Sequence, residues 1–342
     1  MTLRFHPRLI NPPFGDPGLL ISFLLEKRAV LFDAGDISSL SSRDILKISH
    51  IFVSHAHMDH FFGFDRALRL FLGRQKALGL FGPKGIIQHV EGKLAGYSWN
   101  LTSHYANRLI VTATEVDGHE RVTQSWASDD RFVAKQPPAK EPFSGVLLSE
   151  PGFVVRSEEL DHGIVSLGFS LDERFHIQIK KEALHRLGLE PGPWINEFKE
   201  ALFAGAAPDA LISVQTKKKP GEKSETIQTP LGRLSEKIAL ITPGQRIAYI
   251  TDAVFSDANK EKMIRLAKGA DCLFIESPFL DGDADMAKKK RHLTARQAGW
   301  IAGKAGVKRL ELFHFSPRYS GMEDQIQNEA RAAFERFGGP AD

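Results

Sequence analysis

Cysteine is the rarest residue in this chain of 342 residues, and Cys272 is its only occurrence. One cysteine excludes an internal disulfide and a cysteine-based zinc site, and it fits a reducing compartment. No window approaches 18 uninterrupted apolar residues, so no membrane-spanning helix is expected. The stretch Thr2–Pro7 has no apolar segment followed by a small-residue cleavage site, so the sequence predicts no signal peptide. We therefore expect a cytoplasmic protein.

The charge of the chain is close to balanced. The formal net charge is +3 and the isoelectric point is about 8.8. A mildly basic chain permits an anionic substrate but does not demand nucleic acid. With 42% hydrophobic residues, the chain can bury a large core. The simplest expectation is one domain over residues 1–342 that carries an insertion.

The segment His55–His60 holds three histidines and one aspartate within six residues, directly after the apolar run Ile51–Val53. Neutral imidazole is the commonest metal ligand, and zinc also accepts carboxylate oxygen. Side chains alternate in extended chain, so His55 and His57 are expected to point one way. A turn into the next helix would aim Asp59 and His60 at a neighbouring point. The spacing predicts two adjacent metals, and the alternative is a histidine-rich surface loop.

Several apolar runs end in a polar residue that can take part in catalysis, which predicts buried strands with a site at their carboxyl ends. These end residues are Asp33, His55, Asp252, Glu276 and His314. Helix-like stretches at 61–72, 259–267 and 294–305 alternate with such runs and favour strand–helix–strand units. A hairpin is expected at 19–33, and an exposed loop at 217–223. The irregular stretch 113–151 predicts only loops and short strands.

Two sets of motifs resemble a known family. Leu31-Phe32-Asp33-Ala34-Gly35, the His55–His60 segment, and then His162, Asp252 and His314 in that order resemble the metallo-β-lactamase superfamily. A narrower resemblance is to the ribonuclease Z family of tRNA 3′-end endonucleases. It rests on Asp161-His162-Gly163, Gly82-Pro83-Lys84-Gly85, His292-Leu293-Thr294-Ala295 and Phe313-His314-Phe315-Ser316-Pro317-Arg318-Tyr319.

The resemblance implies an α/β fold, the four-layer αββα metallo-β-lactamase sandwich with a small helical arm inserted at 170–210. Pro191, Gly192 and Pro193 are similar to the Gly-Pro motif of the arm, which in that family grips tRNA. A simple turn between two helices is the alternative. Ser316 and Arg318 would contact the substrate. The segment Pro12–Asp16 departs from the family pattern, because the family usually has a Gly-Thr-Gly turn there.

The resemblance also implies two zinc ions, with other divalent metals as an alternative. One zinc would be held by His55, His57 and His162, and the other by Asp59, His60 and His314, while Asp252 would bridge the two. Asp59 would also orient or deprotonate the nucleophile, and Asp33 would steady a ligand imidazole. His292 would protonate the leaving ribose oxygen or steady the phosphate, with Glu276 orienting it. The alternatives are a surface histidine that caps a helix and an ordinary carboxylate at a strand end.

The implied function is that of a zinc-dependent phosphodiesterase, an endoribonuclease that processes tRNA 3′ ends through attack of metal-activated hydroxide on phosphorus. One alternative is a binuclear metallo-phosphodiesterase for small substrates such as cyclic nucleotides. Another is a metallo-hydrolase of carboxylic esters or thioesters. The expected partner is precursor tRNA or another phosphodiester, and a homodimer is typical of the family.

Overall fold

The computed structural model describes residues 3–24, 26–216 and 225–338, so the loop predicted at 217–223 lies outside the described residues. The chain divides into two compact units. The larger unit comprises Phe5–Leu147, Arg156–Ser170 and Arg246–Asp342, and the smaller unit comprises Met1–Arg4, Leu148–Val155 and Leu171–Gln245. Each unit is described by itself.

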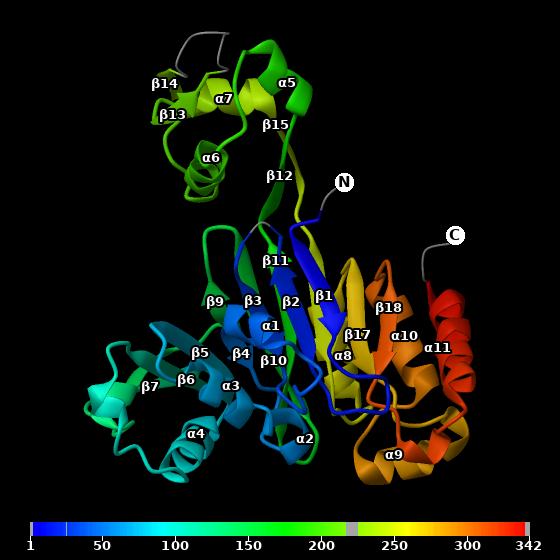
Figure 1. Ribbon diagram of the computed structural model, residues 1–342. Helices are drawn as coiled ribbons and strands as arrows, with labels where there is room; N and C mark the ends of the chain where they lie inside the picture. The colour runs from blue at the N-terminus through cyan, green and yellow to red at the C-terminus, as the bar shows by residue number, and fades with distance from the viewer. Residues whose placement is uncertain (1–2, 25, 217–224, 339–342) are drawn as a thin grey trace. The chain divides into compact units, whose positions relative to one another are not determined.

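The first sheet of the larger unit has eight strands in sequential order (Figure 1). They are β1 (Phe5–Leu9), β2 (Leu19–Phe23), β3 (Ala29–Phe32), β4 (Ile48–Phe52), β5 (Lys76–Pro83), β6 (Leu109–Asp117), β7 (Glu120–Ala127) and β8 (Ala139–Pro142). Strands β3 to β6 are parallel, and the strands on either side of them pair antiparallel. The predicted hairpin is present as β2 and β3, with Leu19 opposite Phe32.

The second sheet has six strands in the order β18-β17-β16-β11-β10-β9. They are β9 (Val146–Ser149), β10 (Phe153–Asp161), β11 (Val165–Glu173), β16 (Arg246–Ile250), β17 (Cys272–Glu276) and β18 (Leu310–Phe313). Strands β16, β17 and β18 are parallel. Their carboxyl ends therefore meet at one rim, as the sequence predicts for a site of this kind.

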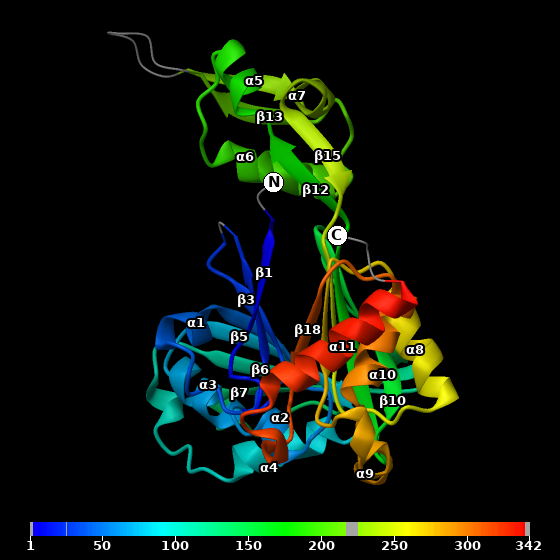
Figure 2. The ribbon, with the colours of Figure 1, turned by 90° about the vertical axis from the view of Figure 1, so that its right-hand side faces the viewer.

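Helices cover the outer faces of both sheets (Figure 2). The first sheet is accompanied by α1 (Ser42–Lys47), α2 (Met58–Phe61), α3 (Phe64–Phe71) and α4 (Ile86–Ala95). The second is accompanied by α8 (Asp257–Ala267), α9 (Ala284–Lys290), α10 (Ala295–Ala305) and α11 (Glu323–Phe337). Short 3₁₀ helices are η1 (Thr102–His104), η2 (Ser128–Asp130), η3 (Asp281–Asp283) and η4 (Pro317–Tyr319).

Local sequence signals set the ends of the longer helices. Helix α10 begins with a capping box, in which the Thr294 side chain accepts from the Gln297 backbone and the Gln297 side chain accepts from the Thr294 backbone. The same helix ends at Gly306, whose φ of 63° suits glycine. Ser256 caps α8 by accepting the backbone N–H of Asn259. No helix in the described part of the chain is long and apolar enough to cross a membrane.

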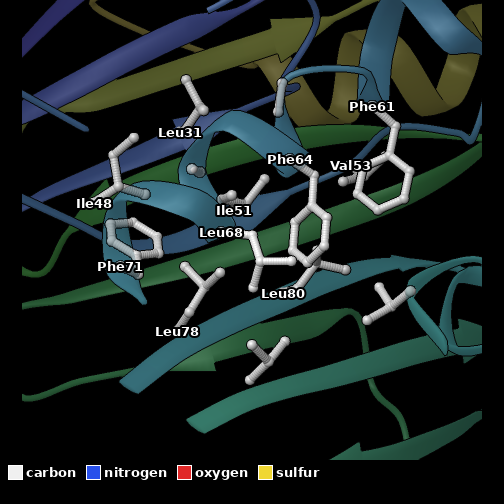
Figure 3. Packing of buried hydrophobic residues seen from close by; sticks show 14 of the residues in the cluster. Leu31, Ile48, Ile51, Val53, Phe61, Phe64, Leu68, Phe71, Leu78 and Leu80 are labelled. Carbon is white, nitrogen blue, oxygen red and sulfur yellow. The ribbon is translucent and has the colours of Figure 1, made fainter. Parts of the chain in front are cut away.

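Aromatic side chains join the two sheets. The Phe32 ring on the first sheet lies 5.2 Å from the Phe169 ring and 5.9 Å from the Tyr249 ring on the second. On the outer face of the first sheet, apolar residues of β3, β4 and β5 pack against α3 (Figure 3). Burial of apolar surface on both faces of each sheet stabilises the packed layers. Each Å² of apolar surface that is buried contributes about 25 cal/mol. The predicted four-layer αββα sandwich is confirmed.

The smaller unit contains helices and two strand pairs. Its elements are β12 (Phe175–Ile179), α5 (Lys181–Arg186), α6 (Trp194–Phe203), β13 (Leu211–Gln215), β14 (Thr226–Pro230), α7 (Leu231–Ile238) and β15 (Ala239–Pro243). Strands β12 and β15 pair antiparallel, as do β13 and β14. Trp194, Phe198 and Val214 are buried in its core. The insertion at 170–210 stays a prediction, and the compact unit extends beyond it to Gln245.

Two sequence-based expectations about elements differ from the structure. The helix expected at 61–72 is present as α3, which begins only at Phe64, while Phe61 is the last residue of the short helix α2. Between them, a Cβ at Gly63 would lie 2.3 Å from the Gly35 carbonyl oxygen. The stretch 113–151 is more regular than expected. Its strand β7 pairs along its whole length with β6, so hydrogen bonds with a neighbour order a segment that has no clear local pattern.

Candidate metal centre

The polar residues that follow the apolar runs lie at the strand ends of the larger unit. Asp33 follows β3 and His314 follows β18, while Glu276 is the last residue of β17. Asp252 lies two residues beyond β16. The predicted site residues His55, His57, Asp59, His60, His162, Asp252, Glu276, His292 and His314 all fall into groups whose donor atoms lie within 4.8 Å of one another.

Three of the residues at the strand ends have backbone φ angles in the left-handed region. The φ angles are 54° at Asp33, 43° at Asp252 and 60° at His314. Such angles are uncommon for residues other than glycine, and they gather at functional sites where the surrounding structure holds them. At all three positions the change of direction comes directly after the end of a strand or within two residues of it. These strained conformations therefore turn the chain at the positions where donor atoms of the site lie.

Glycine allows two loops of the site to approach each other. A Cβ at Gly35 would lie 2.2 Å from the carbonyl oxygen of Asp59, a distance no side chain tolerates. The approach lets Ala34 N–H donate to the His60 carbonyl at 2.8 Å, and Gly63 N–H donate to the Ala34 carbonyl at 2.8 Å. This packing gives the Leu31–Gly35 motif its physical basis.

The first donor group comprises His55, His57, His162 and Asp252. His55 Nε2 lies 2.8 Å from His57 Nδ1. Asp252 Oδ2 lies 3.6 Å from His55 Nε2 and 3.4 Å from His162 Nε2. Three imidazole nitrogens thus converge on one carboxylate oxygen, as in the first of the two predicted ligand sets.

The second donor group comprises Asp59, His60 and His314. Asp59 Oδ2 lies 3.4 Å from His60 Nε2 and 3.5 Å from His314 Nε2. Asp252 also reaches this group, because its Oδ2 is 3.6 Å from His60 Nε2 and its Oδ1 is 2.9 Å from His314 Nδ1. The position of Asp252 between both groups is the one expected of a bridging ligand.

The ring nitrogens of the site fit a metal in two respects. His60 Nε2 and His314 Nδ1 are buried and form no hydrogen bond with any described residue. The opposite nitrogen of His60 is tied down, since its Nδ1 lies 2.9 Å from Asp33 Oδ2, and His162 has a similar tether because its Nδ1 donates to the Arg291 carbonyl at 2.8 Å. Metal-binding histidines typically have one such tethered nitrogen and one that faces the ion. These clusters can hold metal ions.

Burial lowers the pKa values of the buried histidines of the site, and neighbouring carboxylates raise some of them above the ordinary value. Burial, with nearby His60, lowers the pKa of His55 to about 2. Burial also lowers the pKa of His60 and of His314, but Asp252 and the other carboxylates near each ring outweigh it and hold both pKa values well above the ordinary value. Burial raises the pKa of Asp252, and His314 and His60 more than reverse that, so the carboxylate stays ionised. In the absence of a metal, the raised pKa values favour the protonated forms of His60 and His314, and a bound cation would displace those protons.

His292 and Glu276 form a hydrogen-bonded pair beside the two groups. His292 Nδ1 donates to Glu276 Oε2 at 2.8 Å. Glu276 is fully buried, and its other oxygen accepts the backbone N–H groups of Ala253 at 3.0 Å and Leu293 at 3.2 Å. His292 Nδ1 also lies 4.0 Å from Asp252 Oδ1, so the ring is close to both donor groups. Glu276 is therefore placed to set the orientation and the charge of His292.

A pocket of about 340 Å³ opens beside these residues, and it is lined by Phe14, Gly15, Asp16, Asp59, Pro278, Phe279, Lys290, His292, His314, Phe315, Ser316 and Pro317. Of the residues predicted to contact substrate, Ser316 lies in its wall. Arg318 instead donates to Asp283 at 3.3 Å and is not among the lining residues. Pro191, Gly192 and Pro193 belong to the smaller unit, between α5 and α6.

Three buried hydroxyl groups support the site and were not predicted from the sequence. Tyr249 donates to Asp33 Oδ2 at 2.9 Å, and Ser54 donates to the same oxygen at 2.9 Å. Thr251 donates to Asp252 Oδ1 at 2.8 Å. Ser54 and Thr251 each adjoin a predicted ligand in the sequence, which is a weak signal. Tyr249 gives none, because its partner is 216 residues away.

The chain is similar to curated ribonuclease Z sequences along most of its length. It is 32% identical to "Ribonuclease Z" of Enterococcus faecalis over 331 residues, 93% of this chain and 87% of that protein. It is 30% identical to "Ribonuclease Z" of Deinococcus radiodurans over 295 residues, 85% of this chain and 83% of that protein. The chain belongs to the ribonuclease Z family. The resemblance found in the sequence motifs is confirmed, although no family profile matches the chain.

Solved structures agree with family membership at the level of the fold. The short form of human tRNase Z aligns with a TM-score of 0.50 at 20% identity, covering 92% of each chain. The metallo-β-lactamase fold protein YhfI from Bacillus subtilis aligns with a TM-score of 0.51 at 15% identity, covering 95% of this chain and 87% of the other. The metallo-β-lactamase fold expected of the ribonuclease Z family is therefore present. The individual ligand and catalytic roles stay predictions.

Proposed function

We propose that this protein is an endoribonuclease that processes the 3′ ends of tRNA precursors with two bound zinc ions. The observation that carries the proposal is the gathering of the seven predicted ligands in two adjoining groups, with Asp252 between them and the His292–Glu276 pair beside them, in a chain of the ribonuclease Z family. His55, His57 and His162 would hold one ion, and Asp59, His60 and His314 the other.

When bound, the two zinc ions lower the pKa of a water molecule and offset charge on the phosphate. Asp252 would hold both donor groups in register, because its two oxygens face different histidines. Asp59 is 41% exposed on its side chain and lines the pocket, so it would orient the incoming water and accept its proton. The Asp33 carboxylate fixes the His60 ring through Nδ1, which keeps Nε2 aimed into the centre.

His292 would protonate the leaving ribose oxygen. The Nδ1 of its ring is committed to Glu276, so Nε2 is the nitrogen that carries a proton to the substrate. Its side chain is 19% exposed and lines the pocket, so a substrate can reach it. Phosphodiester cleavage needs such an acid, because a ribose alkoxide is a poor leaving group.

The smaller unit would bind the RNA away from the reacting bond. Lys180, Lys181 and Arg186 are exposed at α5, next to the Pro191–Pro193 turn. The turn is held in place, because Trp194 Nε1 donates to the Glu190 carbonyl at 2.8 Å. A large substrate can gain binding energy there that a small one cannot, and this energy supports catalysis. We further propose that the protein acts in the cytoplasm as a homodimer.

One incubation tests the activity. Purified protein is mixed with a precursor tRNA and, separately, with thymidine 5′-(4-nitrophenyl phosphate), before and after metal removal with a chelator. We expect both substrates to be cleaved, cleavage to stop after chelation, and zinc to restore it. Cleavage of the small ester alone would contradict the ribonuclease proposal while leaving the metal proposal intact. Metal analysis by mass spectrometry checks for two zinc ions per chain, and light scattering checks the homodimer.

A further inference from the structure

The pocket beside the metal centre contains groups that the proposed reaction does not use. Phe14, Asp16 and Lys290 line it together with Asp59, His292 and His314. Phe14 and Asp16 come from the segment Pro12–Asp16, which lies between β1 and β2. Phe14, Asp16 and Lys290 are not among the predicted metal ligands.

The segment that carries these residues is held firmly. Phe315 N–H donates to the Pro13 carbonyl at 2.7 Å, and Gly15 N–H donates to the Pro12 carbonyl at 2.8 Å. Asn11 Nδ2 donates to the Asp16 carbonyl at 2.8 Å. The turn is thus attached to the strand end that bears His314. A wall held in this way can discriminate between ligands, because little of the binding energy is lost in ordering it.

Phe14 offers an aromatic surface to the pocket. Its ring meets that of Phe315 edge to face, with the centroids 5.5 Å apart and an interplanar angle of 85°. Phe315 is only 2% exposed, whereas Phe14 is half-buried and lines the pocket. Nucleobases stack on aromatic side chains with little regard to sequence. Phe14 is therefore suited to hold a base of any kind.

Asp16 adds a directional acceptor at the same wall. Its Oδ2 accepts the backbone N–H of Asp36 at 2.9 Å. No donor among the described residues bonds to Oδ1, which leaves this oxygen for a ligand in the pocket. A carboxylate accepts from the exocyclic amine of cytosine or adenine. Guanine offers the same carboxylate its own exocyclic amine and N1–H, whereas uracil has no amino group and carries two carbonyl oxygens that a carboxylate repels.

We propose that this pocket binds the base of the nucleotide whose ribose oxygen leaves, and that Asp16 selects the three bases that carry an amino group over uracil there. The proposal rests on the proposed function, because His292 in the same wall is what brings the leaving ribose oxygen to this pocket. Phe14 stacks on any of the four bases, and Asp16 distinguishes among them by hydrogen bonding.

The test uses precursor tRNAs that differ only in the two nucleotides flanking the cut. At the nucleotide that ends in a free hydroxyl after cleavage, we expect kcat/KM to be about tenfold higher for adenine, cytosine and guanine than for uracil, as one hydrogen bond to a charged group allows. Asp16→Asn should remove this preference. Its amide oxygen must keep the Asp36 N–H, so its NH₂ group would face the ligand and favour a carbonyl. Phe14→Leu should lower all four values by about tenfold and keep the order.

Asp117→Asn is the matched control, because it removes the same charge from an exposed site at the β6–β7 turn that does not line the pocket. It should keep the wild-type order. Equal rates for all four bases in the wild-type protein, or a uniform loss in Asp16→Asn, would overturn the proposal.

A second arm separates failure of this proposal from failure of the proposed function. If no precursor is cut while the nitrophenyl ester is hydrolysed, the function has failed. Inhibition of ester hydrolysis by the four nucleoside 3′-monophosphates then decides the question for the pocket. Weaker inhibition by the uridine compound than by the other three, with the difference lost in Asp16→Asn, supports selection by Asp16, and equal inhibition overturns it.

Discussion

Replacing Glu276 with glutamine tests whether His292 is a general acid. In the wild-type protein Glu276 Oε1 accepts two backbone N–H groups, from Ala253 and Leu293, while Oε2 accepts the proton of His292 Nδ1. In Glu276→Gln the amide oxygen must stay with the backbone donors, because a buried N–H without a partner costs about 1–3 kcal/mol. The NH₂ group then faces His292 Nδ1 and requires that nitrogen to be unprotonated.

The size of the effect follows from the charge at His292. Burial lowers the pKa of His292, but Glu276 outweighs burial and holds this pKa above its ordinary value. Without the Glu276 carboxylate, burial and His314 lower the pKa and only Asp252 still raises it, so the pKa of His292 falls and less of the ring is protonated. Loss of a general acid lowers the rate by about 10²–10⁴-fold, and we expect a fall in this range for precursor tRNA.

The pH dependence has a definite sign. The acid form of His292 is present below its pKa in the folded protein, so cleavage declines as the pH rises through that value. In the wild-type protein the decline should lie above the ordinary histidine pKa, since the shift is upward. In Glu276→Gln it should move to lower pH. The assay is kcat/KM for precursor tRNA across a pH series, with bound zinc measured in the same samples.

Two comparisons make the result specific. 4-Nitrophenolate leaves without a proton, so the nitrophenyl ester should lose far less activity than precursor tRNA. Glu329→Gln is the matched control, because Glu329 also accepts two backbone N–H groups, from Asp281 and Arg296, but is not bonded to His292. An equal loss with both substrates would refute the reasoning. A parallel loss of zinc would instead assign His292 to the metal site, where it already lies 4.0 Å from Asp252.

Four further predictions concern other parts of the chain. Asp252→Ala should lower bound zinc and abolish cleavage, measured by metal analysis and activity, and full activity with less metal would contradict the bridging role. Gly35→Ala should destabilise the fold by about 3 kcal/mol or more in urea unfolding, because its Cβ would lie 2.2 Å from a carbonyl oxygen. Gly92→Ala in α4 is its control: it meets nothing within 4 Å and should stabilise by about 0.5–1 kcal/mol. Tyr249→Phe should weaken zinc binding about 10–100-fold in competition with a chelator, and unchanged affinity would argue against support through Asp33. Replacing residues 180–205 with a Gly-Ser linker should abolish precursor-tRNA cleavage but not ester hydrolysis, and cleavage by the intact protein should fall steeply with salt.

The sequence motifs were sufficient for the fold class through their resemblance to a known family, and short-range patterns marked residues that the structure brings together at the candidate metal centre. An apolar run that ends in a histidine or aspartate predicts both a buried strand and a donor at its carboxyl end, and His55, Asp252 and His314 lie there. The capped start of α10 was equally legible, because Thr294 and Gln297 interact within one helical turn. Such features depend on neighbours in the chain, so they can be predicted without the tertiary structure.

Other features depend on residues that are distant in the sequence, and only the tertiary structure decided them. The hydroxyl of Tyr249 bonds to Asp33 across the two sheets, and no local pattern marks that pairing. Arg318 was predicted to contact substrate from its motif, yet its guanidinium bonds to Asp283, 35 residues away. Asp16 reached the pocket only because chain folding brings its turn against the strand end before His314. A sequence specifies which groups are available, but the close packing of distant segments decides which of them meet.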